Sequence, residues 1–180
     1  MLKIVVNGLE YWNEEKQEFI STKDTELSLE HSLVSVSKWE SKWHKHFIGN
    51  NNLTNEMLID YIRCMTLTQN VNPDVYYAIS EKQMLQIKDY IADSMTATWF
   101  SESAEKKYSR DIITSEVIYY WMIALQIPFE CQKWHLNRLL TLIRVCNEKN
   151  QPEKKMSQAE VMRRNREINE ARRRALNSKG

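Results

Sequence analysis

Residues 119–147 read YYWMIALQIPFECQKWHLNRLLTLIRVCN, and this stretch decides the fold class. Its longest charge-free piece, 117–129, is shorter than the ~20 apolar residues that a membrane span needs, and Pro128 interrupts it. Because Pro128 removes a backbone donor but suits the first turn of a helix, it predicts one helix at about 111–126 and another at about 128–147. Four aliphatic residues form the apolar stripe of the second helix: Leu136, Leu139, Leu140 and Ile143.

The residues before this stretch predict a small β-element followed by helices. Over 1–31, β-branched residues, the turn dipeptide Asn7-Gly8 and the alternation of Leu27 and Leu29 with polar residues are typical of short antiparallel strands, including a hairpin around 14–17. From residue 32 the apolar residues recur at helical spacing. The first helix face is marked by Leu33, Val36, Trp39 or Glu40, Trp43 and Phe47.

Local start signals place the next helices. Thr54 precedes apolar residues that recur at helical spacing, and Asn72 precedes Pro73. Ser80 with Gln83 matches a capping box. We expect helices to begin at these three sites. Residues 93–110 are polar and irregular, so we expect a loop there.

The last thirty residues have a different charge from the rest of the chain. Pro152 interrupts the preceding helix, and Ser157 with Glu160 matches another capping box. Residues 153–180 hold nine Lys/Arg and four Asp/Glu, a net charge of +5. The remaining residues hold 16 Lys/Arg and 20 Asp/Glu, a net charge of −4. The sequence therefore predicts an acidic body and a basic helical tail.

Together these patterns predict an α+β protein that is predominantly α-helical. We expect one globular domain over 1–150, with a small antiparallel β-element at 1–31 and a helical core at 32–150, and a basic helical tail at 151–180. The chain has 42% hydrophobic and 27% charged residues and a net charge of +1, which is typical of a soluble globular protein without a strong field for nucleic acid or membrane.

The cysteine count and the N-terminus indicate the compartment. Three cysteines, with no CxxC pair, argue against a disulfide scaffold and suit a reducing cytosol. The first residues lack a long apolar core and a small-residue cleavage site, so we expect no signal peptide.

The histidines are weak candidates for a metal site. His44 and His46 are two residues apart on an expected helix, so their rings point in different directions and cannot easily join His31 on one ion. We expect His44 and His46 to be exposed positions near the end of that helix.

Cys131 and His135 have better spacing, since residues four apart share a helix face. A structural zinc site needs two more ligands, and Cys146 lies too far along the same helix. We favour core packing for the cysteines. No nucleophile elbow, phosphate-binding loop or zinc-protease signature occurs in the sequence, so we expect no enzymatic activity, catalytic residue, metal or cofactor.

Two sets of residues are candidates for partner binding. Trp39 and Trp43 either pack in the core or form an exposed aromatic ridge on which a partner docks. The tail carries six arginines for an acidic partner or for phosphate: Arg163, Arg164, Arg166, Arg172, Arg173 and Arg174.

The tail also has other interpretations. It could be a solvated helix, because Glu167 and Glu170 lie near the arginines, or a weak helix–helix seam, because Val161, Ile168 and Ala175 recur every seven residues. We favour partner binding or self-association over nucleic acid. One form of self-association places the basic tail of one copy on the acidic body of the next.

Five long blocks of this sequence resemble one family of proteins encoded among the virion genes of tailed bacteriophages, the tail assembly chaperone-like proteins. The blocks cover most of the chain. They are HSLVSVSKWESKWHK (31–45), DYIRCMTLTQNVNPDVY (60–76), MTATWFSE (95–102), the opening stretch continued to NEKN (119–150) and the segment from MSQAEV to NSKG (156–180).

The resemblance implies a non-catalytic, mostly helical adaptor in the cytoplasm of the infected bacterial host. Such a chaperone coats the long tape measure protein, keeps it soluble and helps the tail tube subunits to polymerise around it. The alternative function is a structural virion component, such as a head–tail joining or tail-associated subunit. The resemblance transfers no catalytic residue to this chain.

Overall fold

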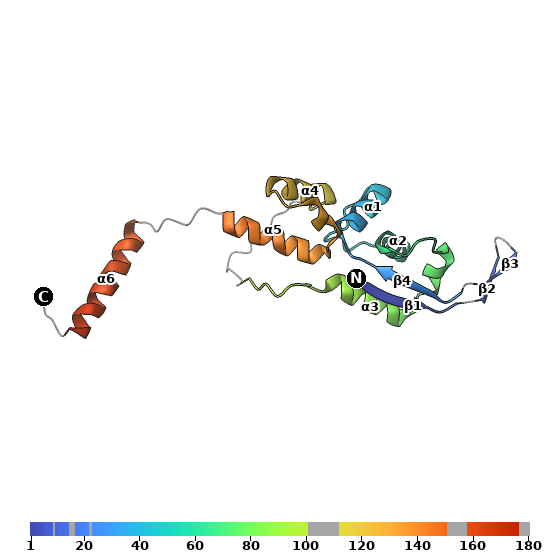
Figure 1. Cartoon of the computed structure of the whole chain (residues 1–180), viewed down its shortest axis with the longest axis horizontal. Helices are drawn as coiled ribbons and strands as arrows, with labels where there is room; N and C mark the ends of the chain where they lie inside the picture. Colours follow the sequence, from blue (N-terminus) through green and yellow to red (C-terminus); the bar gives the residue numbers. More distant parts are fainter. Residues whose placement is uncertain (9, 15–16, 22, 101–111, 151–157, 177–180) are drawn as a thin grey trace. The chain divides into compact units, whose positions relative to one another are not determined.

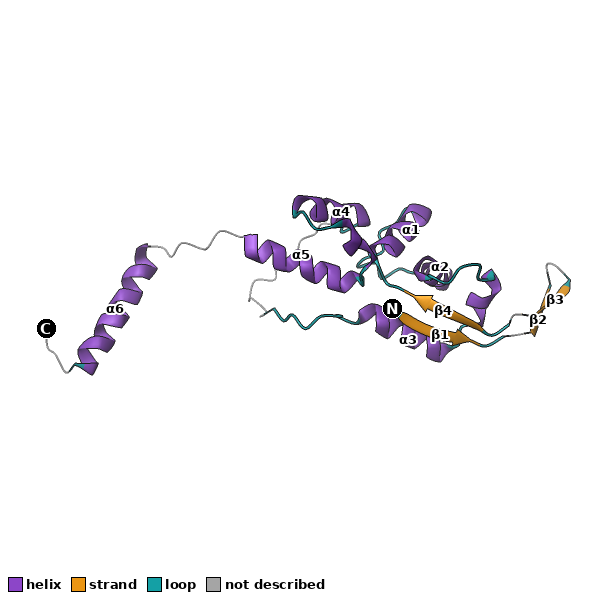
Figure 2. Cartoon of the chain, in the orientation of Figure 1, coloured by secondary structure: helices purple, strands orange, loops and turns teal. Residues whose placement is uncertain are grey.

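A computed structural model describes residues 1–180 except 9, 15–16, 22, 101–111, 151–157 and 177–180. The protein is α+β and predominantly helical, with a small antiparallel β-element near the N-terminus (Figures 1 and 2), which confirms the predicted fold class. The chain divides into two units, Met1–Asn147 and Glu148–Gly180, each described here by itself.

The N-terminal strands form two separate two-stranded antiparallel sheets. β1 pairs with β4 in a register that sets Ile4 opposite Leu27, and β2 pairs with β3 in a register that sets Trp12 opposite Phe19. The strands are β1 (Leu2–Val6), β2 (Glu10–Asn13), β3 (Glu18–Ser21) and β4 (Thr25–Leu29).

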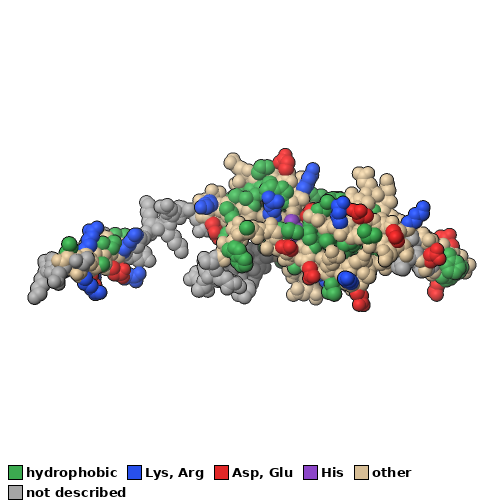
Figure 3. All heavy atoms as spheres, turned by 60° about the horizontal axis from the view of Figure 1, so that its bottom comes forward, with side chains coloured by type: hydrophobic (Ala, Val, Ile, Leu, Met, Phe, Trp, Pro, Cys, Tyr) green, Lys and Arg blue, Asp and Glu red, His purple; other side chains and the backbone are tan. Residues whose placement is uncertain are grey.

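The two sheets differ in what they bury. Ile4 and Leu27 face the core, whereas Trp12 and Phe19 form an edge-to-face pair with ring centroids 5.0 Å apart and remain exposed. Figure 3 shows hydrophobic and acidic side chains gathered at the β2–β3 end of the first unit. The β1–β4 sheet is therefore part of the core, and the β2–β3 hairpin is a surface element.

The first unit contains α1 to α4, two 3₁₀ helices and most of α5, and the second unit contains α6. The helices are α1 (Leu33–Trp43), α2 (Asn55–Met65), η1 (Pro73–Ala78), α3 (Glu81–Ala92), α4 (Ser115–Ala124), η2 (Phe129–Lys133), α5 (Leu136–Asn150) and α6 (Gln158–Ala175). None of the helices in the described ranges is both long enough and apolar enough to cross a bilayer.

The predicted helix starts are confirmed by their capping hydrogen bonds. The Thr54 side chain accepts the N–H of Met57 at the start of α2, and the Asn72 side chain accepts the N–H of Asp74 at the start of η1. Ser80 and Gln83 form the expected capping box of α3. Each cap satisfies a backbone donor that the helix itself leaves unpaired. The capping box predicted at Ser157 lies outside the described residues.

The prediction of one helix over 128–147 is wrong. The 3₁₀ helix η2 ends at Lys133, and α5 begins at Leu136 after an extended backbone at Trp134. The cause is tertiary: His135 forms an antiparallel bridge with Ser32, and the N–H of Leu136 donates to the carbonyl of His31 at 2.7 Å. This pairing to a distant segment overrides the helical period of the sequence.

Two other helix boundaries differ from the predicted ones. The apolar period suggested a helix that continued to Phe47, but α1 ends at Trp43, and His44 adopts a left-handed conformation with φ 51°. His44 and His46 therefore lie in the following loop rather than on the helix.

The second boundary is the start of α4, which begins at Ser115, a few residues after the expected start. Residues 93–100 have no regular structure, as predicted, and the rest of that loop lies outside the described ranges.

Glu40 is a buried carboxylate that joins two segments of the first unit. Its Oε1 accepts the N–H of Phe47 at 2.9 Å, and its Oε2 accepts the N–H of Ser115 at 2.7 Å. The residue before α4, Thr114, makes no side-chain cap hydrogen bond. Glu40 therefore supplies the acceptor at the N-terminus of α4, where the helix dipole favours a negative charge.

We expect the substitution Glu40→Gln to lower the free energy of unfolding by about 1.5–3 kcal/mol, because the amide can accept only one of the two hydrogen bonds and loses the charge. Urea unfolding followed by circular dichroism measures this loss. The matched control is Glu26→Gln, because Glu26 is exposed and pairs with the exposed Lys3. An equal loss in both variants would contradict the role assigned to Glu40.

Candidate functional site

A groove of about 290 Å³ opens on the first unit beside the C-terminal end of α1. We call it the Trp43 groove. Residues from α1, α2 and η1 line it: Lys42, Trp43, Glu56, Ile59, Asp60, Arg63 and Tyr77. Aromatic, aliphatic and charged side chains thus share one concave surface, which is typical of a binding site.

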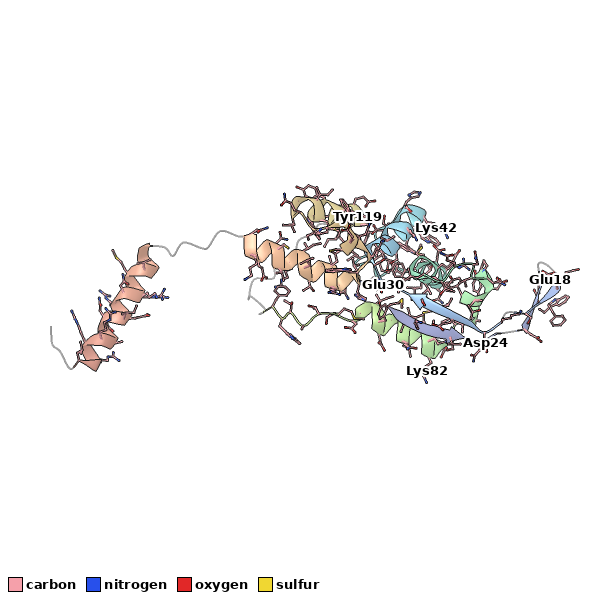
Figure 4. All side chains as sticks on the ribbon, in the orientation of Figure 1. Glu18, Asp24, Glu30, Lys42, Lys82 and Tyr119 are labelled. Carbon is pink, nitrogen blue, oxygen red and sulfur yellow. The ribbon has the colours of Figure 1, made fainter. Side chains whose placement is uncertain are left out.

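Asp60 fixes one wall of the groove. This buried carboxylate accepts the indole N–H of Trp43 at 2.8 Å and pairs with the ammonium of Lys42. The Lys42 side chain (Figure 4) remains 58% exposed, so its charge stays at the rim while it neutralises the buried Asp60. The hydrogen bond and the ion pair together hold the Trp43 ring in one orientation.

Arg63 and Tyr77 also line the groove, and Arg63 lies over the rings of both Tyr77 and the neighbouring Tyr76. The guanidinium carbon of Arg63 lies 5.3 Å from the ring centroid of Tyr76 and 5.4 Å from that of Tyr77. Its Nη2 donates to the Pro73 carbonyl at 3.3 Å, whereas its buried Nε has no hydrogen-bond partner among the described residues. Tyr76 is buried, and Tyr77 is 62% exposed. Arg63 therefore connects α2 to η1 and supports an exposed aromatic ring at the mouth of the groove.

The chemistry of the groove favours binding. Trp, Tyr and Arg are the residues that most often dominate the energy of protein–protein contacts. The neighbouring Cys64 has a raised pKa because of burial and the nearby charge of Asp60, so its thiol stays protonated and is a poor nucleophile.

The structure separates the two tryptophans that the sequence singled out. Trp39 has no exposed surface, and its indole N–H donates to the Met57 carbonyl at 2.9 Å. Trp43 stacks on Trp39 with ring centroids 6.2 Å apart and lines the groove. A surface ridge that includes Trp39 is therefore wrong, because α2 covers this residue. Trp43 alone can meet a partner.

The arginines proposed for partner binding all lie on α6 in the second unit. Arg163, Arg164, Arg166, Arg172, Arg173 and Arg174 are exposed. The Nε of Arg163 lies 3.9 Å from Glu167 Oε1, one helical turn further on. Such an exposed pair contributes little to stability.

The candidate metal ligands of the sequence have other roles. Cys131 is buried in the core, as expected from packing. His31 and His135 are both buried, with ring centroids 5.0 Å apart. The two rings are hydrogen-bonded to the Tyr61 hydroxyl and the Tyr90 carbonyl, respectively. In the described part of the chain, no group of three His, Cys, Asp or Glu side chains is arranged to hold a metal ion.

Sequence reasoning missed Asp60, Arg63 and Tyr77 as site residues. One signal could have pointed to Asp60: it lies between Met57 and Tyr61 on the apolar side of α2, where a carboxylate needs a buried partner. No comparable pattern marks Tyr77.

Comparisons with known proteins find no match to this chain among family models, curated proteins or solved structures. Its function is therefore inferred from its own residues and from the resemblance of its sequence blocks.

Proposed function

We propose that the chain is a non-catalytic tail assembly chaperone that binds the phage tape measure protein through the Trp43 groove. One observation carries this proposal: two of the sequence blocks that resemble the chaperone-like family meet at the Trp43 groove. Lys42 and Trp43 come from the block 31–45, and Asp60 and Arg63 come from the block 60–76. Four of the seven residues that line the groove thus come from two blocks that support the resemblance.

The groove suits an amphipathic helical segment of the partner. An apolar side chain inserted between Trp43 and Tyr77 would bury aromatic surface, and Lys42, Glu56 and Arg63 at the rim would pair with polar groups beside it. In this proposal the chaperone covers an apolar stripe of the tape measure protein until the tail tube subunits polymerise around it. The exposed arginines of α6 are proposed as a second contact, for acidic groups of the partner.

The first test is co-expression with the tape measure protein encoded nearby, followed by pull-down and gel filtration. We expect a soluble complex where the tape measure protein alone precipitates. The substitution Tyr77→Ala should weaken the complex by about tenfold or more, because it removes an exposed aromatic contact without opening the core. The matched control is Leu85→Ala on α3, since Leu85 is 61% exposed and Tyr77 is 62% exposed.

Three results would contradict the proposal. If no complex forms with the wild-type chain, the tape measure protein is not the partner. If Tyr77→Ala binds as well as Leu85→Ala, the Trp43 groove is not the contact. If mass spectrometry finds the chain in multiple copies in purified virions, the structural-component function replaces the chaperone function.

A further inference from the structure

The β2–β3 hairpin presents an aromatic pair to solvent. Trp12 and Phe19 lie opposite each other on the two strands, and they are 50% and 76% exposed. A two-stranded hairpin is only marginally stable in water unless one of its faces packs against something else. The hairpin therefore carries an aromatic surface that the first unit leaves uncovered.

Carboxylates flank this aromatic pair. Residues 10–21 hold four Glu and one Lys, a net charge of −3. Glu10 lies two residues before Trp12 and so on the same face of the hairpin, because side chains alternate along a strand. Glu14 is exposed at the start of the turn, and Figure 3 shows acidic beside hydrophobic side chains at this end of the unit. We call this surface the hairpin face: Glu10, Trp12, Glu14 and Phe19.

Helix α6 has the opposite charge and combines it with apolar residues on one side. Residues 158–175 hold six Arg and three Glu, a net charge of +3. At 3.6 residues per turn, Glu167 and Glu170 lie on one side of the helix, with Arg163 and Arg174. The other side has exposed arginines and exposed apolar residues. We call it the Arg172 side: Val161, Met162, Ile168, Arg172 and Arg173.

The hairpin face and the Arg172 side match in charge and in chemistry. A guanidinium placed over an aromatic ring is attracted to it, and tryptophan is the best ring for this contact. Glu10 and Glu14 can accept charge-assisted hydrogen bonds from the same guanidinium groups. The apolar residues of α6 can cover the remaining ring surface. A purely apolar partner would leave the carboxylates unpaired, and a purely basic one would leave the rings in water.

We propose that the Arg172 side of α6 in one copy docks on the hairpin face of a second copy. In Figure 1 the hairpin lies at one end of the first unit, and the C-terminal end of α5 lies at the other. The seven residues between α5 and α6 span at most about 25 Å. A compact unit of 147 residues measures about 38 Å across. Val161 and Met162, in the first turn of α6, therefore do not reach the hairpin of their own chain.

The proposed contact is heterologous, because different surfaces of the two copies meet, so it links copies into rings or filaments. It gives the contact between basic tail and acidic body a defined site. It does not use the Trp43 groove, so it can fail without affecting the proposed binding of the tape measure protein.

Sedimentation velocity of the full chain, from about 1 µM to about 300 µM, tests the contact over the range of weak complexes. We expect the wild-type chain to self-associate at low salt and to dissociate as the salt concentration rises, because salt screens exposed charges. Arg172→Ala with Arg173→Ala should raise the dissociation constant about tenfold or more. The matched control is Arg163→Ala with Arg174→Ala, which removes the same charge from the other side of α6 and should associate like the wild type.

A mixing experiment tests whether the two surfaces bind each other. Trp12→Ser with Phe19→Ser removes the aromatic pair, and Glu10→Lys with Glu14→Lys is a second hairpin variant that keeps this pair. Each hairpin variant, and the Arg172→Ala, Arg173→Ala variant, should stay monomeric alone. An equimolar mixture of a hairpin variant with the α6 variant should form heterodimers, because the intact α6 of one docks on the intact hairpin of the other. Circular dichroism checks that each variant is folded.

Three results would overturn the proposal. A wild-type chain that stays monomeric over the whole range has no contact of this kind. Self-association that persists in both hairpin variants is built on another surface. A mixture that stays monomeric would show that the hairpin face and the Arg172 side do not bind each other.

Discussion

Replacing Trp39 with alanine should lower the free energy of unfolding by about 3–5 kcal/mol, the range for truncating a large aromatic side chain in a core. Trp39 has no exposed surface and packs against Trp43 and edge-on to Phe47. Its loss would leave a cavity between α1 and α2 and would remove the hydrogen bond to the Met57 carbonyl. Urea unfolding followed by far-ultraviolet circular dichroism measures the change.

Two variants separate the contributions to this loss. Trp39→Phe keeps most of the buried ring and removes the N–H, so it should cost less than Trp39→Ala. Trp12→Ala removes a tryptophan that is half exposed on the β2–β3 hairpin, and we expect a change within about 1 kcal/mol. A loss below about 1 kcal/mol for Trp39→Ala would contradict its place at the centre of the core.

Acidification should destabilise the protein through His31. Burial, and then the adjacent His135, lower the pKa of His31 from 6.5 to about 3. Between these two values the unfolded chain binds a proton that the folded chain does not bind, so the stabilising contribution is complete above pH 6.5 and is lost as the pH falls toward 3. We expect the free energy of unfolding to fall by about 2 kcal/mol between about pH 7 and about pH 5 from this residue alone.

The slope of stability against pH identifies the residue responsible. His31→Gln removes the titrating group, so its free energy of unfolding should fall less steeply over the same pH interval. His44→Gln is the control, because His44 is an exposed histidine in the loop after α1. Equal slopes for the wild type and His31→Gln would assign the acid sensitivity to other groups. Urea unfolding at a series of pH values gives these slopes.

The His31 environment also shows why this residue could not be interpreted from the sequence. His31 follows β4 and His135 precedes α5, and more than a hundred residues separate them. They meet because the Ser32–His135 bridge brings the two segments together. No local period or motif encodes a contact of this kind, since it depends on how the helices pack.

The sequence by itself determined most of the local structure. Thr54, Asn72 and Ser80 mark helix starts because their side chains satisfy backbone donors within the next few residues. The alternation of Leu27 and Leu29 predicted a half-buried strand, because successive side chains of a strand point to opposite sides. These signals depend on neighbours in the chain, so they can be predicted without knowledge of the tertiary fold.

Only the tertiary structure decided which residues form the surfaces. Trp39 and Trp43 are four residues apart and lie on the same helix face. However, α2 buries Trp39, whereas Asp60 holds Trp43 at the groove. The extended backbone at Trp134 likewise depends on hydrogen bonds to residues near His31. The physical reason is the same in each case: burial and pairing between distant segments contribute more free energy than the local preference of a few residues.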